Sequence, residues 1–186
     1  RVRSVKGVTG ATPFIYTEVM LSGGGGVKGV VLRGIDPESA PAVLSMLRQM
    51  RSGSAANLER EGTPGLIIGE ELAKRLGLGM GSRVNLLSPS GQKTTSGYAP
   101  RVRPFEVVGI FKTGMFEYDS SLGFVTLGAS RDVLGLPENY LSGIELTVDD
   151  VYKADKISTL VSTELGSPFY VRSWMEMNAN LFAALT

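Results

Sequence analysis

The chain has 186 residues, of which 42% are hydrophobic and 20% charged, and its formal net charge is +1. This composition is typical of a globular chain with a real buried core, in one domain or two small ones, and the near-neutral charge gives no support for nucleic-acid binding. The sequence contains neither cysteine nor histidine, which excludes disulfides, thiol chemistry, Ser-His-Asp catalysis and the usual zinc sites.

The first elements predicted along the chain are two strands joined by a glycine-rich loop. Apolar side chains alternate over residues 14–21 and predict a strand, and residues 27–33 predict its return. Residues 22–26, SGGGG, predict the loop, because successive glycines lose much conformational entropy when ordered. A phosphate-binding loop is the functional alternative, but Lys28 is followed by Gly29 instead of the serine or threonine that a P-loop requires.

An amphipathic helix is predicted next, over about residues 39–51. Asp36 or Ser39 is expected to cap its first turn. Four apolar residues share one face at helical spacing: Val43, Leu44, Leu47 and Met50. A polar connector then follows, with a short helical turn expected at about residues 55–61.

A short buried strand is predicted at residues 66–68, followed by a helix over residues 70–76. Gly77 is expected to end this helix as a C-cap. The glycines at 77, 79 and 81 do not form a dinucleotide-binding fingerprint, because they follow a helix instead of a strand.

The second half of the chain predicts further short strands and helices. Apolar runs predict strands at about residues 105–111, 124–127, 144–148 and 169–171. Residues 112–122 are predicted as a connector. Apolar stripes predict helices at about residues 130–134, 149–165 and 174–185.

This order of elements predicts an α+β fold with mixed and antiparallel sheets and crossover helices. Residues 1–61 with 141–186 are expected to form one α+β subdomain. Residues 62–140 are expected to form a smaller, β-rich subdomain inserted into it, which carries a protruding hairpin at 88–104.

The segment 88–104, SPSGQKTTSGYAPRVRP, is the most distinctive stretch of the sequence. It is polar, it separates two apolar strands, and it is too long for a tight turn. Pro89 and Pro100 restrict the backbone near its two ends and favour two extended arms. Three basic residues make it cationic: Lys93, Arg101 and Arg103. A solvated loop with no role is the alternative interpretation.

The carboxylates of the sequence do not predict a catalytic site. The pairs 70–71 and 149–150 are adjacent in sequence, so their side chains do not face each other on a helix. Aspartates at 149 and 150 are typical of a helix start. We therefore expect no catalytic residue, no cofactor and no metal, and the residues favour a protein-interaction module over an enzyme or small-molecule binder.

Several motifs, in order, resemble the permease subunits of lipoprotein-releasing (Lol) ABC transporters, the LolC/LolE family, within a wider superfamily that includes MacB-type efflux permeases and FtsX-like proteins. The similarity covers nearly the whole chain. The motifs are RGID at 33–36, GEELA at 69–73 with LGL at 76–78, VVGIFKTGM at 107–115 with EYDS at 117–120, and SW at 173–174 with NLFAAL at 180–185.

The resemblance implies a periplasmic domain at the bacterial inner membrane, between the first two transmembrane helices of a permease, with residues 1–61 and 141–186 as its porter-like subdomain. The chain starts at Arg1 and shows no signal peptide or membrane span, so we expect a piece of a longer protein. Such machines extract lipoproteins from the inner membrane and pass them to a soluble carrier, LolA. The implied partners are this carrier, lipoprotein cargo, a second permease and a cytoplasmic ATPase subunit, with no nucleic acid.

The resemblance also places a carrier-binding hairpin, the hook, at residues 88–101. The partner-binding residues are then expected to be Pro89, Gln92, Lys93, Thr94, Thr95, Tyr98, Pro100, Arg101 and Arg103. Arg103 falls on an arginine of a neighbouring polar surface, the pad, but Asn85 and Val102 stand where the family has arginine and glutamine. The hook implies the carrier-receiving type of permease or a hybrid of both types.

The alternative function is that of a MacB-type efflux or FtsX-like permease, whose periplasmic domain binds an adaptor or an effector protein.

Overall fold

The computed structural model describes residues 1–179, apart from the side chains of Ser90 and Gln92. The chain forms two compact units, Arg1–Ala11 with Glu145–Thr186, and Thr12–Ile144. Residues 12–61 therefore share a unit with residues 62–140, whereas the sequence placed these two segments in different subdomains. Strand pairing explains the difference, because strands from both segments alternate within one sheet.

Six strands pair in a cycle that returns to its starting strand. The order is β2-β7-β4-β6-β5-β1, and β1 also pairs with β2. The pairs β2–β7 and β4–β6 are parallel and the other pairs are antiparallel, so the predicted mixed α+β fold is confirmed. The bounds are β1 Val8–Gly23, β2 Gly26–Ile35, β4 Gly65–Gly69, β5 Arg83–Thr94, β6 Gly97–Phe111 and β7 Leu122–Thr126. We call this cycle the strand ring; two further strands lie off it, with β3 (Met50–Gly53) paired to β6 and β8 (Gly143–Val148) paired to β1.

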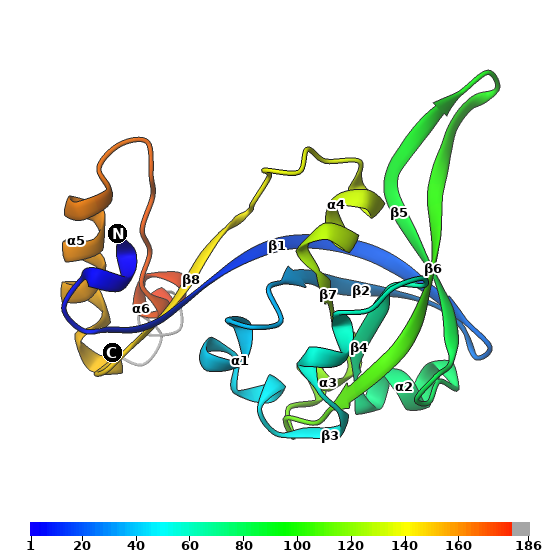
Figure 1. Ribbon diagram of the computed structural model, residues 1–186, viewed down its shortest axis with the longest axis horizontal. Helices are drawn as coiled ribbons and strands as arrows, with labels where there is room; N and C mark the ends of the chain where they lie inside the picture. The colour runs from blue at the N-terminus through cyan, green and yellow to red at the C-terminus, as the bar shows by residue number, and fades with distance from the viewer. Residues whose placement is uncertain (180–186) are drawn as a thin grey trace. The chain divides into compact units, whose positions relative to one another are not determined.

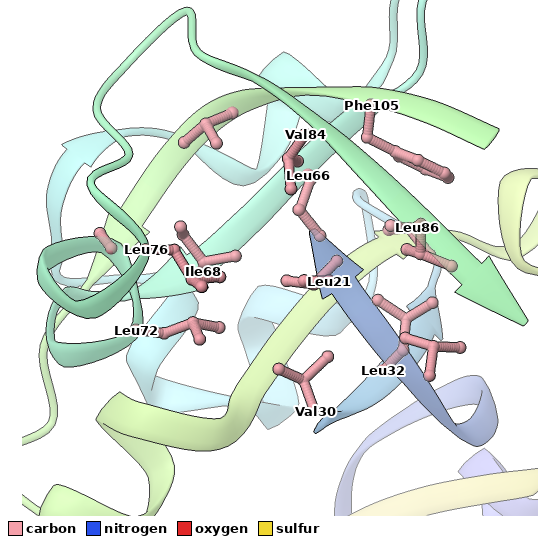
Figure 2. Packing of buried hydrophobic residues seen from close by; sticks show 14 of the residues in the cluster. Leu21, Val30, Leu32, Leu66, Ile68, Leu72, Leu76, Val84, Leu86 and Phe105 are labelled. Carbon is pink, nitrogen blue, oxygen red and sulfur yellow. The ribbon is translucent and has the colours of Figure 1, made fainter. Parts of the chain in front are cut away.

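The main hydrophobic core joins the strand ring to helix α2 (Glu70–Leu76). Apolar side chains from all six ring strands and from α2 converge in this cluster together with Val133, as Figure 2 shows for Leu21, Leu32, Leu66 and Phe105. These four side chains are at most 1% exposed. Burial of each such side chain contributes about 1.5–3 kcal/mol, so this cluster is the rigid body on which any site is mounted.

Helix α2 begins and ends where the sequence predicted. Gly77 lies in the left-handed region at φ 65°, and its N–H and that of Leu78 bond the last carbonyls of the helix. At the other end, Glu70 forms ion pairs with Lys112 at 3.0 Å and Arg51 at 3.3 Å. The hydrogen bond from Lys112 lowers the pKa of the Glu70 carboxyl, and Lys74 adds to the effect. The first turn of α2 is thereby joined to β3 and to the end of β6.

The helix predicted over residues 39–51 is wrong. The segment holds a four-residue helix, α1 (Ala40–Val43), a 3₁₀ turn, η2 (Ser45–Leu47), and strand β3. Leu44 has an extended backbone, φ −102° and ψ 102°, which interrupts the helix. The pairing of β3 with β6 outweighs helical propensity here, although Leu44 and Leu47 are buried in a second cluster as their spacing required.

Helix α3 (Phe116–Ser121) lies in the segment predicted as a connector. Its Asp119 side chain is 3% exposed and accepts hydrogen bonds from the backbone N–H groups of Thr113 (2.7 Å) and Gly114 (3.0 Å) and from the Thr113 hydroxyl (2.8 Å). These bonds to one carboxylate shape the turn that precedes α3. The sequence missed the helix because the feature that stabilises it is a side chain folding back onto the preceding loop.

The unit of residues 1–11 with 145–186 is the smaller of the two. Asp150 accepts a hydrogen bond from the N–H of Tyr152 at the 3₁₀ turn η4 (Val151–Lys153), which leads into α5 (Ala154–Leu165). Helix α6 covers Trp174–Met177; the predicted helix continued to residue 185, but its residues 180–185 lie outside the described part of the chain. The strand predicted at 169–171 is wrong, because this segment pairs with no strand among the described residues and Tyr170 is 98% exposed.

The remaining elements are the 3₁₀ turns η1 (Val2–Ser4) and η3 (Ala55–Leu58) and the helix α4 (Leu127–Leu134).

Among residues 1–179, no helix is both long and apolar enough to cross a bilayer.

Candidate functional site

Strands β5 and β6 continue beyond the strand ring as a two-stranded arm, seen in Figure 1 to project from the rest of their unit. The pairs Lys93↔Tyr98 and Thr94↔Gly97 hold the two strands together near the tip. Thr95 and Ser96 make the turn. Gly97 adopts φ 123°, a value that a side chain would disfavour, and its carbonyl accepts a hydrogen bond from the Thr94 hydroxyl at 2.7 Å.

An irregularity in the pairing marks where the arm leaves its base. Ser88 pairs with Arg101 and Gln92 pairs with Ala99, so four steps along β5 oppose two steps along β6. Pro89 lies in the longer stretch, where the missing N–H of a proline costs no regular ladder bond. We call residues 89–100 the arm, and the paired residues below them the base.

The tip of the arm is exposed and polar apart from one aromatic side chain. Tyr98 is 79% exposed. Lys93, Thr94, Thr95 and Pro100 are also exposed. The tip therefore presents one large amphipathic ring, one cation and several hydroxyl groups, which is the chemistry of a protein contact and not of an enclosed site.

The base differs from the tip because α4 contacts its arginines. The Arg103 Nε lies 3.0 Å from the Asp132 Oδ2, and the Arg101 Nη1 lies 3.5 Å from the Asp132 carbonyl oxygen. The Arg101 guanidinium also lies against Gly135, the left-handed residue that ends α4, since a Cβ built there would be only 2.7 Å from it. A cation is favourable at a helix C-terminus. Of the nine predicted partner-binding residues, these two are thus held by the protein itself.

Residues of the predicted pad lie on two opposite faces of β5 and β6. Side chains alternate along a strand, so Arg101 and Arg103 share the face that meets α4. Asn85 pairs with Pro104 and Leu87 pairs with Val102, which puts Asn85 and Val102 on the other face. Val102 is 46% exposed. Asn85 and Val102 therefore do not form one continuous surface with Arg103.

Sequence reasoning missed the contribution of α4. Asp132 and Gly135 stand about 30 positions from the arginines that they meet, and no local pattern links the two segments. The helix itself extends further than predicted, because the Thr126 hydroxyl caps it by accepting from the Ala129 N–H at 3.1 Å. The sequence signal for the start of α4 was Thr126, because threonine is a common N-cap residue.

One hollow lies at the base and another at the start of the arm. One, of about 570 Å³, is lined by residues that include Pro64, Arg103 and Asp132. The other, of about 450 Å³, is more apolar and is lined by residues that include Met20, Val31 and Pro89. Neither gathers a set of titratable groups suited to acid-base catalysis, and no group of three or more carboxylates suited to a metal occurs in the described part of the chain.

Residues 1–163 match the family of MacB-like periplasmic core domains, and the chain belongs to this family. Two solved structures share its fold. The periplasmic region of MacB from Actinobacillus actinomycetemcomitans superposes with a TM-score of 0.58 at 14% identity, over 100% of this chain and 80% of that one. The extracellular domain of the noncanonic ABC-type transporter YknZ from Gram-positive bacteria has a TM-score of 0.56 at 17% identity, over 89% and 80%.

Within the family, the sequence is similar to lipoprotein-releasing system transmembrane proteins, which confirms the resemblance predicted from the motifs. It is 32% identical to LolC of Neisseria meningitidis serogroup B over 97% of this chain and 43% of that protein. It is 30% identical to LolC of Xylella fastidiosa strain Temecula1 over 96% and 42%, and 22% identical to LolE of Haemophilus influenzae over 90% and 40%. The chain thus spans less than half the length of these curated relatives.

Proposed function

We propose that this chain is the periplasmic domain of a Lol-type ABC transporter permease and that it recruits a LolA-like lipoprotein carrier through the arm. The observation that supports the proposal is that an exposed arm occurs in a chain whose sequence is 32% identical to a LolC protein. The arm has few contacts with the rest of its unit, so the proposal explains its length and its exposed tyrosine by a partner instead of by folding.

The geometry of the arm suits docking. A preorganised binding element loses less conformational entropy on association than a disordered loop does. Here the ladder pairs Lys93↔Tyr98 and Thr94↔Gly97 and the prolines at both ends restrict the backbone before any partner arrives. The free edges of the two strands also offer backbone groups to a partner strand.

Tyr98 is the anchor that we propose at the tip. Tyrosine is enriched among interface residues whose truncation weakens binding most, because it buries a large rigid ring and keeps a hydroxyl for hydrogen bonding. Tyr98 is the most exposed large hydrophobic side chain of the arm. It fits an apolar cavity in the carrier, of the kind that holds acyl chains.

The remaining parts of the proposal concern the full-length protein. The domain would lie on the periplasmic face of the inner membrane, tethered by segments outside this chain. It would act with a partner permease and a cytoplasmic ATPase subunit, and lipoprotein cargo would pass from the permease to the carrier. No catalytic role is assigned to the domain itself.

The decisive experiment removes the arm without disturbing the base. Because Ser88 and Arg101 are paired, a two-residue Asn-Gly turn in place of residues 89–100 closes the strands at that point. We expect carrier binding, measured by surface plasmon resonance, to fall below detection while circular dichroism shows an unchanged fold. Undiminished carrier binding by this variant contradicts the proposal.

A second measurement tests the anchor. Tyr98→Ala is expected to weaken carrier binding by about thirtyfold or more, in line with a loss of about 2 kcal/mol or more at a central interface tyrosine. Ser96→Ala, also exposed at the tip and not among the predicted partner-binding residues, is the matched control and should change affinity by less than about threefold. Equal effects of the two variants argue against Tyr98 as anchor. An adaptor protein of an efflux pump, tested in parallel, should not bind.

A further inference from the structure

We infer that Asp132 is a positioning residue for the arm: together with the C-terminus of α4 it holds Arg101 and Arg103, and so sets the direction in which the arm leaves the strand ring. We call four residues the latch: Arg101, Arg103, Asp132 and Gly135. The inference about direction rests on the geometry alone; its consequence for carrier affinity rests on the proposed function.

Helix α4 is a rigid support for the latch. Two of its own side chains, Ser130 and Val133, are fully buried. Gly34 of β2 lies so close to Ser130 that a Cβ on Gly34 would be 2.2 Å from the Ser130 Oγ. Such close approach, possible only without a side chain at residue 34, fixes α4 against the strand ring. A group attached to its last turn therefore moves with the ring.

The latch acts at the point where the ladder is weakest. Arg101 pairs with Ser88, and this is the pair of the base that lies next to the irregularity between Ser88 and Gln92. An interrupted ladder bends and twists more easily than a continuous one. The contacts of Arg101 with α4 restrict bending of the ladder at this point. A small change in the bend angle would displace the tip strongly, because the tip lies at the far end of the arm.

The two arginines contact α4 in complementary ways. Arg103 meets the Asp132 carboxylate through its Nε at 3.0 Å. Arg101 lies beside the Asp132 carbonyl group at the helix end, where Gly135 provides the space because it has no side chain. The helix C-terminus carries partial negative charge, so both contacts place a guanidinium beside an acceptor.

A simpler interpretation is that Asp132 only neutralises the positive charge of Arg103 and does not position the arm. If Asp132 masks Arg103, Asp132→Asn raises the net charge of the chain and frees the arginine, so binding to an acidic partner becomes tighter. If Asp132 positions the arm, the same substitution loosens the arm and weakens binding. The two interpretations therefore differ in the sign of one effect.

The test measures the direction of the arm without any partner. The sequence has no cysteine, so Thr95→Cys at the tip and Glu59→Cys, an exposed site of the same unit, give one spin-label pair. We expect a narrow distance distribution in the parent chain by pulsed electron spin resonance and a broader or shifted one with Asp132→Asn. Glu138→Gln, the same change of charge at an exposed site past the end of α4, should leave the distribution unchanged, and Asp132→Glu should largely restore it.

Carrier affinity is then measured on the same variants without labels. Asp132→Asn is expected to weaken binding about twofold to fivefold, the range that an exposed ion pair supports, with no change for Glu138→Gln. An unaltered distance distribution in Asp132→Asn overturns the inference, and so does tighter binding. A broadened distribution in a chain that binds no carrier supports the latch and refutes the proposed function, so the two failures are distinguishable.

Discussion

The strand ring and the arm are built from the same two strands, β5 and β6, yet they are stabilised differently. Within the ring, Leu86 and Phe105 are at most 1% exposed and their strands are paired on both sides. In the arm, the strands pair with each other and with no other strand of residues 1–179, and Tyr98 is 79% exposed. One pair of strands thus passes from a region where burial stabilises the structure to one where stability comes from backbone pairing and prolines.

This difference teaches where function is free to reside. A side chain in the ring is constrained by its packing, and a change there alters the free energy of unfolding. A side chain on the arm touches little of its own unit, so it can change without loss of the fold. The following predictions test this separation, starting with the substitution expected to have the largest effect on stability.

Phe111→Ala is expected to lower the free energy of unfolding by about 3–5 kcal/mol, because it leaves a cavity at a fully buried ring. Phe111 is 0% exposed and packs edge-to-face against Phe124, with ring centroids 5.6 Å apart. Urea denaturation followed by circular dichroism measures the change. A loss below about 1 kcal/mol would falsify the assignment of this aromatic pair to the core.

Asp119→Ala is expected to destabilise the unit by about 2–3 kcal/mol. The substitution removes a buried carboxylate that accepts three hydrogen bonds from Thr113 and Gly114. A hydrogen bond to a charged group contributes about 1.5–3 kcal/mol to stability, and such contributions do not simply add. Glu117→Ala, exposed on the same helix, is the control and should change stability by less than about 0.5 kcal/mol. If both variants melt alike, the carboxylate does not hold the turn before α3.

Glu70 is expected to make stability depend on pH in the acid range. The hydrogen bond from Lys112 lowers the pKa of its carboxyl below the ordinary value of 4.5. Because the folded pKa is lower than the unfolded one, the stabilisation is fully present above the unfolded pKa and is lost as the pH falls through the folded pKa.

Melting temperatures from pH 7 to pH 2 measure this dependence. Glu70→Gln should be less stable than the parent chain near neutral pH, and the two curves should converge as the pH falls through the lowered folded pKa of Glu70. Glu71→Gln is the closest control, since Glu71 lies next along α2 and contacts only Lys74 among the ion pairs of the described residues. Parallel curves for Glu70→Gln and the parent chain would show that the ion pairs of Glu70 contribute nothing.

Tyr98→Ala is expected to leave the free energy of unfolding within about 0.5 kcal/mol of the parent value, since an exposed side chain contributes little to folding. The same variant is the one expected to lose carrier affinity. A clear loss of stability in thermal melts would mean that the Tyr98 ring packs against its own unit, and the separation between ring and arm would then not hold.

Local sequence patterns predicted much of this protein. The α+β class, helix α2 with its Gly77 cap, and the run of strands from β4 to β7 were all predictable from apolar spacing and glycine position. The hairpin was predictable for the same reason, because two prolines and a polar interior between apolar strands are features of the chain itself. Family membership followed from motif order, which is also a property of the sequence.

Tertiary structure decided the rest. Residues 39–51 carry a helical pattern, but Leu44 is extended and β3 pairs with β6 because a partner strand was available. The closing of the strands into a cycle, the placing of residues 12–61 with 62–140, and the capture of Arg101 and Arg103 by α4 all join residues far apart in the chain. Such contacts depend on which surfaces meet after folding, and no local pattern of residues encodes them.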